Sequence, residues 1–371
     1  MIYLDYNATT PIDKQVADAM IPYIYGNFGN PSSSHELGIA SKIAVEHARE
    51  QIAKLLHSLP EEITFTSGGS ESNNTVIKGV AHTYKNKGNH IITSRIEHPA
   101  ILNPCHYLEK LGYEVSYLEV DEYGMVDPAD IEKLITDKTI LVTIMHSNNE
   151  IGTLQPIEEI VKICRSHDVL FHSDASQSIG KVPVDVEKLG IDFLTLAGHK
   201  LYAPKGIGAL YIRNGIKIEP LIHGAGHEFG KRAGTENIIF DVALGKACEI
   251  SMEVLKNSGV KDLTDYFYFN LKEMFGEKIH LNGHPEKKLP NTLNISFLGY
   301  NGHEVLSRLN GVAASTGSAC HSGSTAISPV LEAMGVSNEV GRGAVRFSLG
   351  RYTTKEEIDT VIDNLKKIIV L

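Results

Sequence analysis

The chain of 371 residues contains no tryptophan and only four cysteines. The cysteines, Cys105, Cys164, Cys248 and Cys320, are far apart in the sequence and form no Cys-x-x-Cys pair. Such spacing favours free thiols in a reducing compartment over a disulfide framework. Cys164 and Cys248 stand in apolar, helix-like stretches, and together with Cys105 they are predicted to be structural residues.

Strongly basic stretches and long apolar runs are also missing. The formal net charge is −10 at pH 7, which argues against a nucleic acid or an anionic membrane as the partner. No run of about 18 apolar residues occurs, and the first residues lack the basic flank and apolar region of a secretion signal. We therefore expect no membrane-spanning segment and a cytoplasmic location.

Histidine, in contrast, is abundant, with 17 residues. Metal sites have recognisable spacings, such as His-Glu-x-x-His or a cysteine and histidine cluster. None of these spacings occurs in the sequence. We therefore predict no metal site.

Strand-like and helix-like stretches alternate over roughly the first 250 residues. Short apolar runs predict strands at residues 62–66, 90–94, 140–144, 169–172, 192–196 and 208–213, and a helix is predicted after the turn at 67–70. Near-continuous apolar strands separated by helices are typical of a mostly parallel sheet covered on both faces. Further on, alternating strands such as 292–297 and an amphipathic helix at 355–371 predict a second, α+β unit.

One cysteine stands in a different setting from the other three. Cys320 lies among small polar residues at 315–323, which offer few apolar side chains to bury a thiol. A cysteine on a solvent-facing loop is more consistent with a nucleophile than with a core residue. Cys320 is therefore a candidate catalytic residue.

Two ionisable residues follow predicted strands directly. Asp174 comes after the strand ending at His172, and Lys200 comes after the strand at 192–196. Ligands of open α/β sheets bind at the carboxyl ends of strands. There a carboxylate can pair with a protonated pyridine nitrogen, and a desolvated lysine can form a Schiff base. The simpler interpretations are a turn cap for Asp174 and a solvated surface charge for Lys200.

The turn Gly68-Gly69-Ser70 precedes a predicted helix. Free backbone N–H groups at the start of a helix can bind a phosphate. A glycine-containing turn is common, so this signal is weak by itself.

Several motifs carry a resemblance to a known family. In chain order they are Tyr3-Leu4-Asp5 with Asn7-Ala8-Thr9-Thr10, Gly29-Asn30-Pro31-Ser32-Ser33, Thr66-Ser67-Gly68 with Glu71-Ser72, Glu97-His98, Asn148-Asn149-Glu150-Ile151-Gly152, His199-Lys200, Arg232-Ala233-Gly234-Thr235-Glu236-Asn237, Gly317-Ser318-Ala319-Cys320 and Arg346-Phe347-Ser348-Leu349-Gly350-Arg351. Over essentially its whole length the chain resembles the cysteine desulfurases of the NifS/IscS family. These belong to the class-V aminotransferase superfamily of enzymes that use pyridoxal 5'-phosphate.

This resemblance implies the architecture of a fold type I pyridoxal-phosphate enzyme. We expect a large cofactor-binding domain over residues 13–255, with a mostly parallel seven-stranded sheet flanked by helices. A smaller α+β domain is expected from residues 1–12 together with 256–371, and it would carry the loop with Cys320.

The resemblance also implies roles for the residues around the cofactor ring. Lys200 would bind the cofactor through a Schiff base. Asp174 would pair with the pyridine nitrogen, and Gln177 would bind the phenolic oxygen. His98 would stack on the ring and assist proton transfer, although a histidine there is otherwise interpreted as a core or cap residue.

Other residues would bind the phosphate by the same resemblance. Gly69, Ser70 and His199 would contact it from one subunit. Thr235 would reach it from the partner subunit of a homodimer, so that the active site is shared between the two chains.

Substrate binding completes the implied site. Asn149 would contact both the cofactor and the substrate, and Arg346 would bind the substrate carboxylate through its bidentate guanidinium. Cys320 would then attack the substrate sulfur. Without the resemblance, Arg346 would be interpreted as a surface charge.

The implied activity is the conversion of L-cysteine to L-alanine, with sulfur held as a persulfide on Cys320. An acceptor protein, such as an iron–sulfur scaffold or a thiolation relay, would take the sulfur. Two alternatives stay open: a selenocysteine lyase-type activity on the same fold, and a non-catalytic binding partner with this fold. Neither alternative depends as strongly on Cys320. His321 is a candidate cationic neighbour that would favour the Cys320 thiolate.

The sequence departs from the family pattern at three places. Ala197 stands where relatives often carry a phosphate-binding serine. Residues 224–230 contain His227-Glu228-Phe229 in place of the usual glutamine and arginine, near the expected mouth of the active site. Tyr6 replaces a smaller residue and is predicted to be a packing variation.

Overall fold

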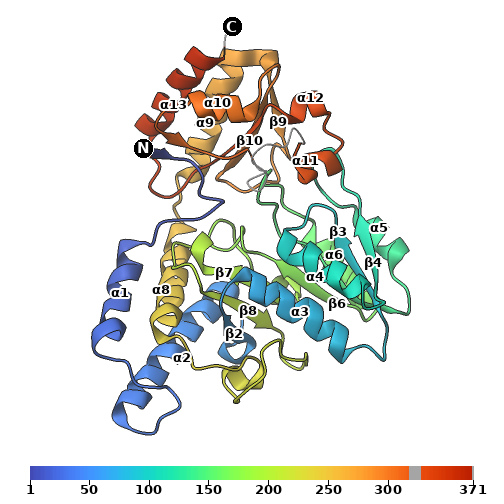
Figure 1. Ribbon diagram of the computed structural model, residues 1–371, viewed down its shortest axis with the longest axis vertical. Helices are drawn as coiled ribbons and strands as arrows, with labels where there is room; N and C mark the ends of the chain where they lie inside the picture. The colour runs from blue at the N-terminus through green and yellow to red at the C-terminus, as the bar shows by residue number, and fades with distance from the viewer. Residues whose placement is uncertain (317–326, 370–371) are drawn as a thin grey trace.

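The computed structural model describes residues 1–316 and 327–369, and its largest element is a seven-stranded sheet (Figure 1). The strands are β2 (Ile63–Thr66), β3 (His90–Ser94), β4 (Glu114–Leu118), β5 (Thr139–Thr143), β6 (Leu170–Asp174), β7 (Phe193–Ala197) and β8 (Gly208–Ile212), in the order β2-β8-β7-β6-β5-β3-β4. Only β8 runs antiparallel to its neighbours. The predicted mostly parallel sheet is confirmed.

Helices cover both faces of this sheet (Figure 1). They are α1 (Lys14–Tyr25), α2 (Glu36–Leu56), α3 (Gly69–Thr83), α4 (Pro99–Glu109), α5 (Pro128–Leu134), α6 (Ile157–Ser166), α7 (Val186–Leu189) and α8 (Ile238–Val254), with short 3₁₀ turns η1 (Pro60–Glu62), η2 (Gly198–Lys200) and η3 (Glu228–Gly230). Successive strand side chains point to opposite faces. Ile91 and Leu141 therefore pack with α3 and α4, whereas Ile92 and Val142 pack with α2, α6 and α8.

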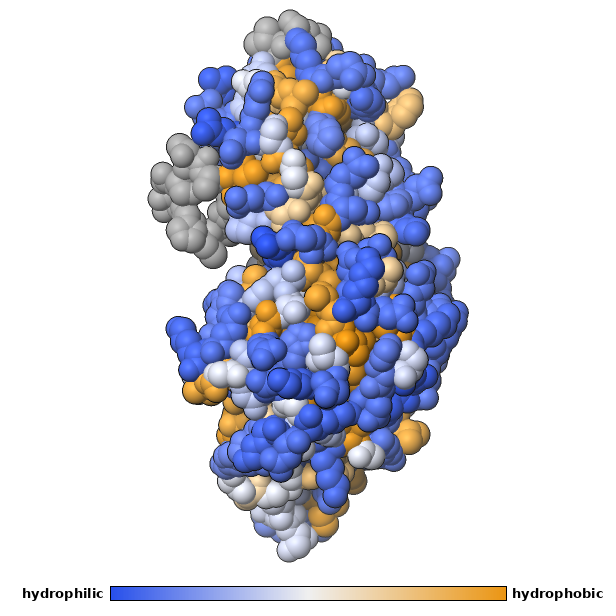
Figure 2. Space-filling view, turned by 90° about the vertical axis from the view of Figure 1, so that its right-hand side faces the viewer, coloured by the Kyte–Doolittle hydropathy of each residue, from blue (hydrophilic) through white to orange (hydrophobic). Residues whose placement is uncertain are grey.

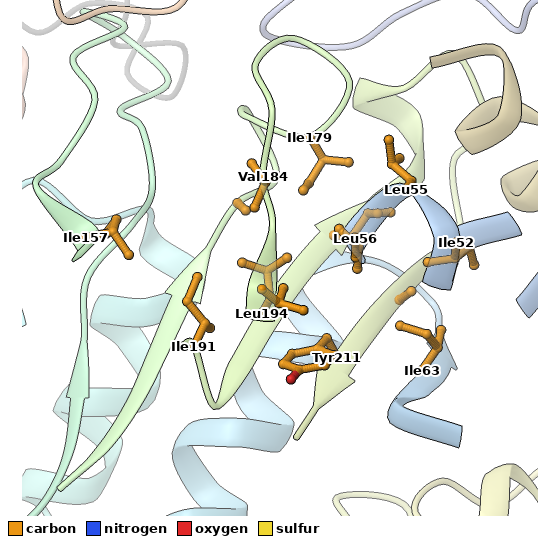
Figure 3. Packing of buried hydrophobic residues seen from close by; sticks show 14 of the residues in the cluster. Ile52, Leu55, Leu56, Ile63, Ile157, Ile179, Val184, Ile191, Leu194 and Tyr211 are labelled. Atoms are coloured by element: carbon orange, nitrogen blue, oxygen red, sulfur yellow. The ribbon is translucent and has the colours of Figure 1, made fainter. Parts of the chain in front are cut away.

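The larger of these two cores lies under α2. Figure 3 shows Ile52 and Leu56 of this helix next to Leu194 of β7 and Tyr211 of β8, and all four side chains are fully buried. Burying one such side chain stabilises a fold by roughly 1.5–3 kcal/mol. This core holds the strands that end at the candidate site in a fixed register.

A second unit has its own antiparallel sheet, in the order β12-β10-β9 (Figure 1). Its elements are β9 (Ile279–Asn282), β10 (Thr292–Phe297), β12 (Ala344–Ser348), α9 (Val260–Phe275), α10 (Gly302–Arg308), α11 (Pro329–Ala333), α12 (Asn338–Gly341), α13 (Lys355–Ile368) and the 3₁₀ turn η4 (Gly276–Lys278). The apolar stripe of α13 is buried in a core that also contains Leu4, Phe267 and Phe347. The amphipathic helix predicted near the end of the chain is therefore confirmed.

The first residues of the chain belong to this second core. Strand β1 (Ile2–Tyr3) pairs in parallel with β11 (Val312–Ala313), and Leu4 is fully buried. We propose the expected division, 13–255 against 1–12 with 256–371, as the domain boundary, because residues 1–12 and 256–371 share one core that is distinct from the two cores of the large sheet.

The face of the molecule shown in Figure 2 is mostly hydrophilic, with apolar side chains among the hydrophilic ones. Among the residues that the structure describes, no helix is both long enough and apolar enough to cross a bilayer.

Candidate active site

Asp174 and Lys200 emerge at the same edge of the large sheet. Strand β6 ends at Asp174, which pairs with Thr195 of the parallel strand β7, and β7 leads directly into the turn η2 that contains Lys200. The carboxyl ends of parallel strands form the usual ligand-binding edge of an open α/β sheet. The strand-end prediction for both residues therefore agrees with their placement.

Two donors fix the carboxylate of Asp174, which is 8% exposed. Its Oδ2 accepts a hydrogen bond from Asn73 Nδ2 of α3 at 2.7 Å, and its Oδ1 accepts one from the Ser176 backbone N–H at 2.9 Å. The second bond is the local turn contact that the simpler interpretation predicts. The first holds the carboxylate in one orientation at the strand end.

The amine of Lys200 is half-buried and donates to two backbone carbonyl oxygens, those of Asn7 at 2.5 Å and Ala8 at 2.7 Å. Desolvation lowers its pKa to about 8, and the positive charge of Arg346 acts in the same direction. Near pH 8 about half of the amine is then neutral and nucleophilic. The partial burial of the side chain and its two carbonyl contacts do not fit the interpretation as a solvated surface charge.

Arg346 of β12 comes from the second unit and is 5% exposed. Its NH2 group forms an ion pair with Asp5 Oδ1 at 2.6 Å, and its NH1 group donates to the backbone oxygen of Asn149 at 3.0 Å. Its Nε is buried and has no partner within the described part of the chain. Arg346 is therefore no surface charge, and the structure brings it together with Asn149.

The helix α3 begins without a side-chain cap, which suits an anion. Its N-cap residue Gly68 has a φ of 142° and provides no side-chain cap to the first N–H groups of the helix. A Cβ atom on Gly69 would stand 3.1 Å from Ser176 Oγ and 3.5 Å from Ala197 Cβ. A side chain there would crowd the ends of the strands. The side chain of Ser70 is exposed.

These groups fit pyridoxal 5'-phosphate. A helix N-terminus with free N–H groups suits a phosphate, a fixed carboxylate suits a ring N–H, and an amine with a lowered pKa suits an aldehyde. The departure at Ala197 is also accounted for locally, because its methyl group packs beside Gly69.

His98 begins α4, and its Nδ1 accepts a hydrogen bond from the Ala100 backbone N–H at 3.0 Å. The cap contact of the simpler interpretation is thus present. Desolvation lowers the pKa of His98, with Asp174 opposing and Lys200 reinforcing the shift. A neutral ring whose Nδ1 accepts must carry its proton on Nε2. The stacking role of His98 stays a prediction.

Glu97 lies directly before His98 and is fully enclosed. Its Oε1 accepts from Ser94 Oγ and from the Met145 backbone N–H, both at 2.8 Å. Burial raises its pKa to about 8, so the carboxyl is protonated at neutral pH. It anchors the turn that presents His98, a function that sequence reasoning did not assign.

His199 of η2 contacts Thr9 Oγ1 through Nδ1 at 3.1 Å. Desolvation, followed by the charge of Lys200, lowers its pKa to about 4. The imidazole is therefore neutral at pH 7. It can serve the expected phosphate contact as a hydrogen-bonding group.

Gln177 forms hydrogen bonds with two residues that the sequence analysis did not assign to the site. Its Nε2 donates to the backbone oxygen of Asn7 at 2.9 Å, and its Oε1 accepts from Lys181 Nζ at 2.8 Å. The spacing of four residues between Gln177 and Lys181 was the only local signal for the second contact. Asn7 was part of a recognised motif without a role.

Thr235 has an exposed side chain in the single chain. Three residues before it, Arg232 Nε forms an ion pair with Glu71 Oε1 at 2.9 Å in the first turn of α3. The motif therefore lies beside the first turn of α3 in its own chain. A contact from Thr235 to the partner subunit stays a prediction.

Cys320 and His321 lie outside the described residues. The other three cysteines, Cys105, Cys164 and Cys248, are buried and free, as predicted. Burial raises the pKa of Cys105 and of Cys164 to about 12, so their thiols are protonated and poor nucleophiles.

The two remaining departures have structural explanations. Tyr6 is 6% exposed and packs against Tyr3 and Tyr202, at ring distances of 4.9 and 5.9 Å. The carboxylate of Glu228 is buried and pairs with Arg49. A role of residues 224–230 in substrate or partner preference stays a prediction.

Comparison with known proteins places this site in a family. Residues 2–361 match the family described as aminotransferase class-V. The chain is 50% identical over 372 residues to a protein of Dictyoglomus turgidum named cysteine desulfurase IscS, covering 99% of this chain and 94% of that protein. A Methanosarcina thermophila protein of the same name is 49% identical over 99% of this chain and 92% of its own length.

Solved structures of similar proteins support the same family. A NifS-like protein superposes with a TM-score of 0.93 at 39% identity, covering 99% of this chain and 98% of its own. A structure titled SspA in complex with cysteine has a TM-score of 0.85 at 39% identity, covering 95% of this chain and all of its own. The chain therefore belongs to the class-V aminotransferase family, in its NifS/IscS branch.

Proposed function

We propose that this protein is a cysteine desulfurase that uses pyridoxal 5'-phosphate to convert L-cysteine to L-alanine. The observation that carries the proposal is the full-length likeness, at 50% identity, to a protein named cysteine desulfurase. A structural relative whose title names cysteine supports the same substrate. Lys200, Asp174 and Arg346 are the residues that would carry out this reaction.

The cofactor, when bound, supplies an electron sink for the α-carbon of an amino acid. Asp174 would hold its ring nitrogen, because two donors already fix that carboxylate. The start of α3, with Gly69 and Ser70, would hold its phosphate together with His199. Thr235 of a second subunit would add a contact in a homodimer.

Lys200 would move the substrate proton. Its pKa of about 8 leaves a useful share of neutral amine near neutral pH, and a general base works best when its pKa lies close to the working pH. The carbonyl oxygens of Asn7 and Ala8 hold Nζ in place. His98, with its proton on Nε2, would assist from the start of α4.

Arg346 would orient the substrate through its carboxylate. The guanidinium is nearly inaccessible to water, and its Nε has no partner among the described residues. An unused buried donor costs stability until an acceptor arrives, so a carboxylate is favoured there. Asn149 is held beside it through its backbone oxygen.

Cys320 would accept the sulfur as a persulfide and pass it to an acceptor protein, such as an iron–sulfur scaffold or a thiolation relay. Only the thiolate attacks, and at an ordinary pKa of about 8.5 several per cent of the thiol is ionised at pH 7.4. His321 is the neighbour that would raise this share. We also propose a cytoplasmic location.

Replacing Cys320 with alanine tests the proposal. We expect Cys320→Ala to retain the cofactor band at about 420 nm and its shift on addition of L-cysteine, but to lose sulfide release. Mass spectrometry should find one added sulfur on Cys320 of the unchanged protein. Cys164→Ala, at a buried thiol, is the matched control and should keep its activity.

Three results would contradict the proposal. Full L-cysteine desulfuration by Cys320→Ala would exclude the thiol as the sulfur acceptor. Faster turnover of selenocysteine than of cysteine by both proteins would favour the lyase alternative. Absence of any spectral response to cysteine would favour a non-catalytic role.

A further inference from the structure

Lys181 lies behind the candidate active site and has no role in the function proposed above. Its side chain is half-buried, and it lies in the turn that follows Gln177. Its Nζ donates to Gln177 Oε1 at 2.8 Å and to Asn7 Oδ1 at 3.0 Å. Lys181 and Lys200 line the same small cavity of about 50 Å³.

The contact with Lys181 determines which way the amide of Gln177 faces. Nζ of Lys181 donates in this contact, so the amide presents its oxygen to Lys181. Its Nε2 is then directed to the other side, where it donates to the backbone oxygen of Asn7 at 2.9 Å. The same carbonyl oxygen accepts from Lys200 Nζ. The amide donor of Gln177 and the amine of Lys200 therefore converge on one point.

Asn7 is oriented in the same way. Its Oδ1 accepts from Lys181 and also from Asn291 Nδ2 at 3.1 Å, while its Nδ2 donates to Thr292 Oγ1 at 2.8 Å. The side chain has one consistent arrangement of donors and acceptors. Lys181 thus stabilises both groups that surround the amine of Lys200.

The electrostatic surroundings of Lys181 are unfavourable for a lysine. The charged groups that act on it are the cations Lys200 and Arg346, and with desolvation, the larger cause, they lower its pKa well below the ordinary value. A desolvated cation beside two others costs free energy that an apolar side chain of similar length would avoid. The two amide oxygens that it binds are what offset this cost.

We propose that Lys181 is a positioning residue that fixes the amide of Gln177 so that its N–H group, and not its oxygen, faces the phenolic oxygen of the cofactor beside Lys200. This inference rests on the proposed function, because it takes the cofactor contact of Gln177 from there. Without Lys181 the amide is free to rotate, and its oxygen would then oppose the phenolic oxygen.

A double-mutant cycle on cofactor binding tests this inference. Apoprotein is titrated with pyridoxal 5'-phosphate, and the dissociation constant and the wavelength of the visible band are measured. We expect Lys181→Met and Gln177→Ala each to weaken binding about tenfold, the size typical of one charge-assisted hydrogen bond. Both should shift the band in the same direction. The double variant should be no worse than either single variant, since both remove one interaction.

Lys205→Met is the matched control, because the exposed Lys205 donates to the backbone oxygen of Thr10, at 3.0 Å, and forms no hydrogen bond with Gln177 or Asn7 among the described residues. It should bind the cofactor as the unchanged protein does. Thermal unfolding identifies any misfolded variant. If Lys181→Met does not fold, Lys181→Gln is used in its place. This variant keeps a neutral donor, so the affinity for the cofactor should fall by about threefold.

Two outcomes would overturn the inference. One is independent, multiplying effects of the two substitutions, which would mean that Lys181 does not act through Gln177. The other is a Lys181 variant that matches Lys205→Met in affinity and band position. If the unchanged protein itself forms no cofactor band, the proposed function fails, and this result is distinct from both.

Discussion

Two buried arginines of this protein, Arg49 and Arg346, have nearly the same low exposure but different surroundings. Arg49 of α2 is enclosed in the large core, and Arg346 of β12 lies between the two units. Both form an ion pair with a carboxylate, at 2.7 Å to Glu228 and 2.6 Å to Asp5. What distinguishes them is whether every donor is used.

The donors of Arg49 are saturated. Its NH1 group also binds the backbone oxygen of Ile63 at 2.8 Å, and its Nε binds Glu46 at 3.2 Å. The guanidinium is further covered by the ring of Phe229, at 5.1 Å. No polar atom remains for a ligand, so Arg49 is a structural residue.

Arg346 has an Nε without a partner in the part of the chain that the structure describes, and the side chain of its ion-pair partner Asp5 is 21% exposed. It also lowers the pKa of Lys200. The comparison teaches that a buried charge indicates a ligand site when part of its hydrogen-bonding capacity is unused. Burial alone does not distinguish the two arginines.

The largest expected effect is on stability, at Arg49. Arg49→Met should lower the free energy of unfolding by about 3–5 kcal/mol, because it leaves the buried Glu228 carboxylate without its counter-charge, with a hydrogen bond from the Phe65 backbone N–H remaining. Denaturant unfolding measures this loss. Glu46→Gln is the control, since Glu46 is a half-exposed partner, and it should cost less than about 1 kcal/mol. Equal losses of unfolding free energy in the two variants would contradict the structural role of the buried pair between Arg49 and Glu228.

The next effect is on catalysis, at Arg346. Arg346→Met should lower kcat/KM for L-cysteine by about 100-fold, or about 2.7 kcal/mol, through loss of carboxylate binding. Its free energy of unfolding should change by only about 1 kcal/mol, because Asp5 can be rehydrated. Steady-state kinetics and denaturant unfolding on the same preparation test both expectations. A large stability loss with normal kcat/KM would make Arg346 a second structural arginine.

A smaller effect is expected at the partner of Arg346. Asp5→Asn keeps an acceptor for the NH2 group but removes the charge, so the guanidinium is held less firmly. We expect KM for L-cysteine to rise about three- to tenfold, with kcat changed less. An unchanged KM would show that Asp5 does not position Arg346.

The smallest effect is a shift in pH dependence. The rate at which apoprotein takes up pyridoxal 5'-phosphate should rise with pH with a midpoint near 8, because Lys200, whose lowered pKa is about 8, attacks only when neutral. In Arg346→Met the midpoint should move to higher pH, since a nearby positive charge is removed. Rapid-mixing absorbance measures both. A midpoint near 10 in the unchanged protein would contradict the desolvation of Lys200.

Short apolar runs in the sequence predicted most strands of the large sheet. The central strands are buried on both faces, and they are therefore almost continuously apolar. Strand β4 was missed since it is an edge strand, with Glu114 exposed and its central residues only half-buried. Placement at strand ends made Asp174 and Lys200 candidates, but only the family resemblance favoured them over a turn cap and a solvated surface charge.

Other parts of the site could not be predicted from local sequence. Arg346 was assigned by resemblance alone, because its contact with Asp5 joins positions 341 residues apart. The contacts between Lys181 and Asn7 and between Arg49 and Glu228 also join distant positions, 174 and 179 residues apart. Contacts of this kind cannot be predicted from local sequence, because the folded chain brings the distant segments together.

Covalent mapping of the cofactor tests the central claim most directly. The protein is loaded with pyridoxal 5'-phosphate, reduced with borohydride, digested and analysed by mass spectrometry. We predict a single cofactor adduct, on Lys200, with Lys181 and Lys205 unmodified. An adduct on another lysine, or none on Lys200, would contradict the account.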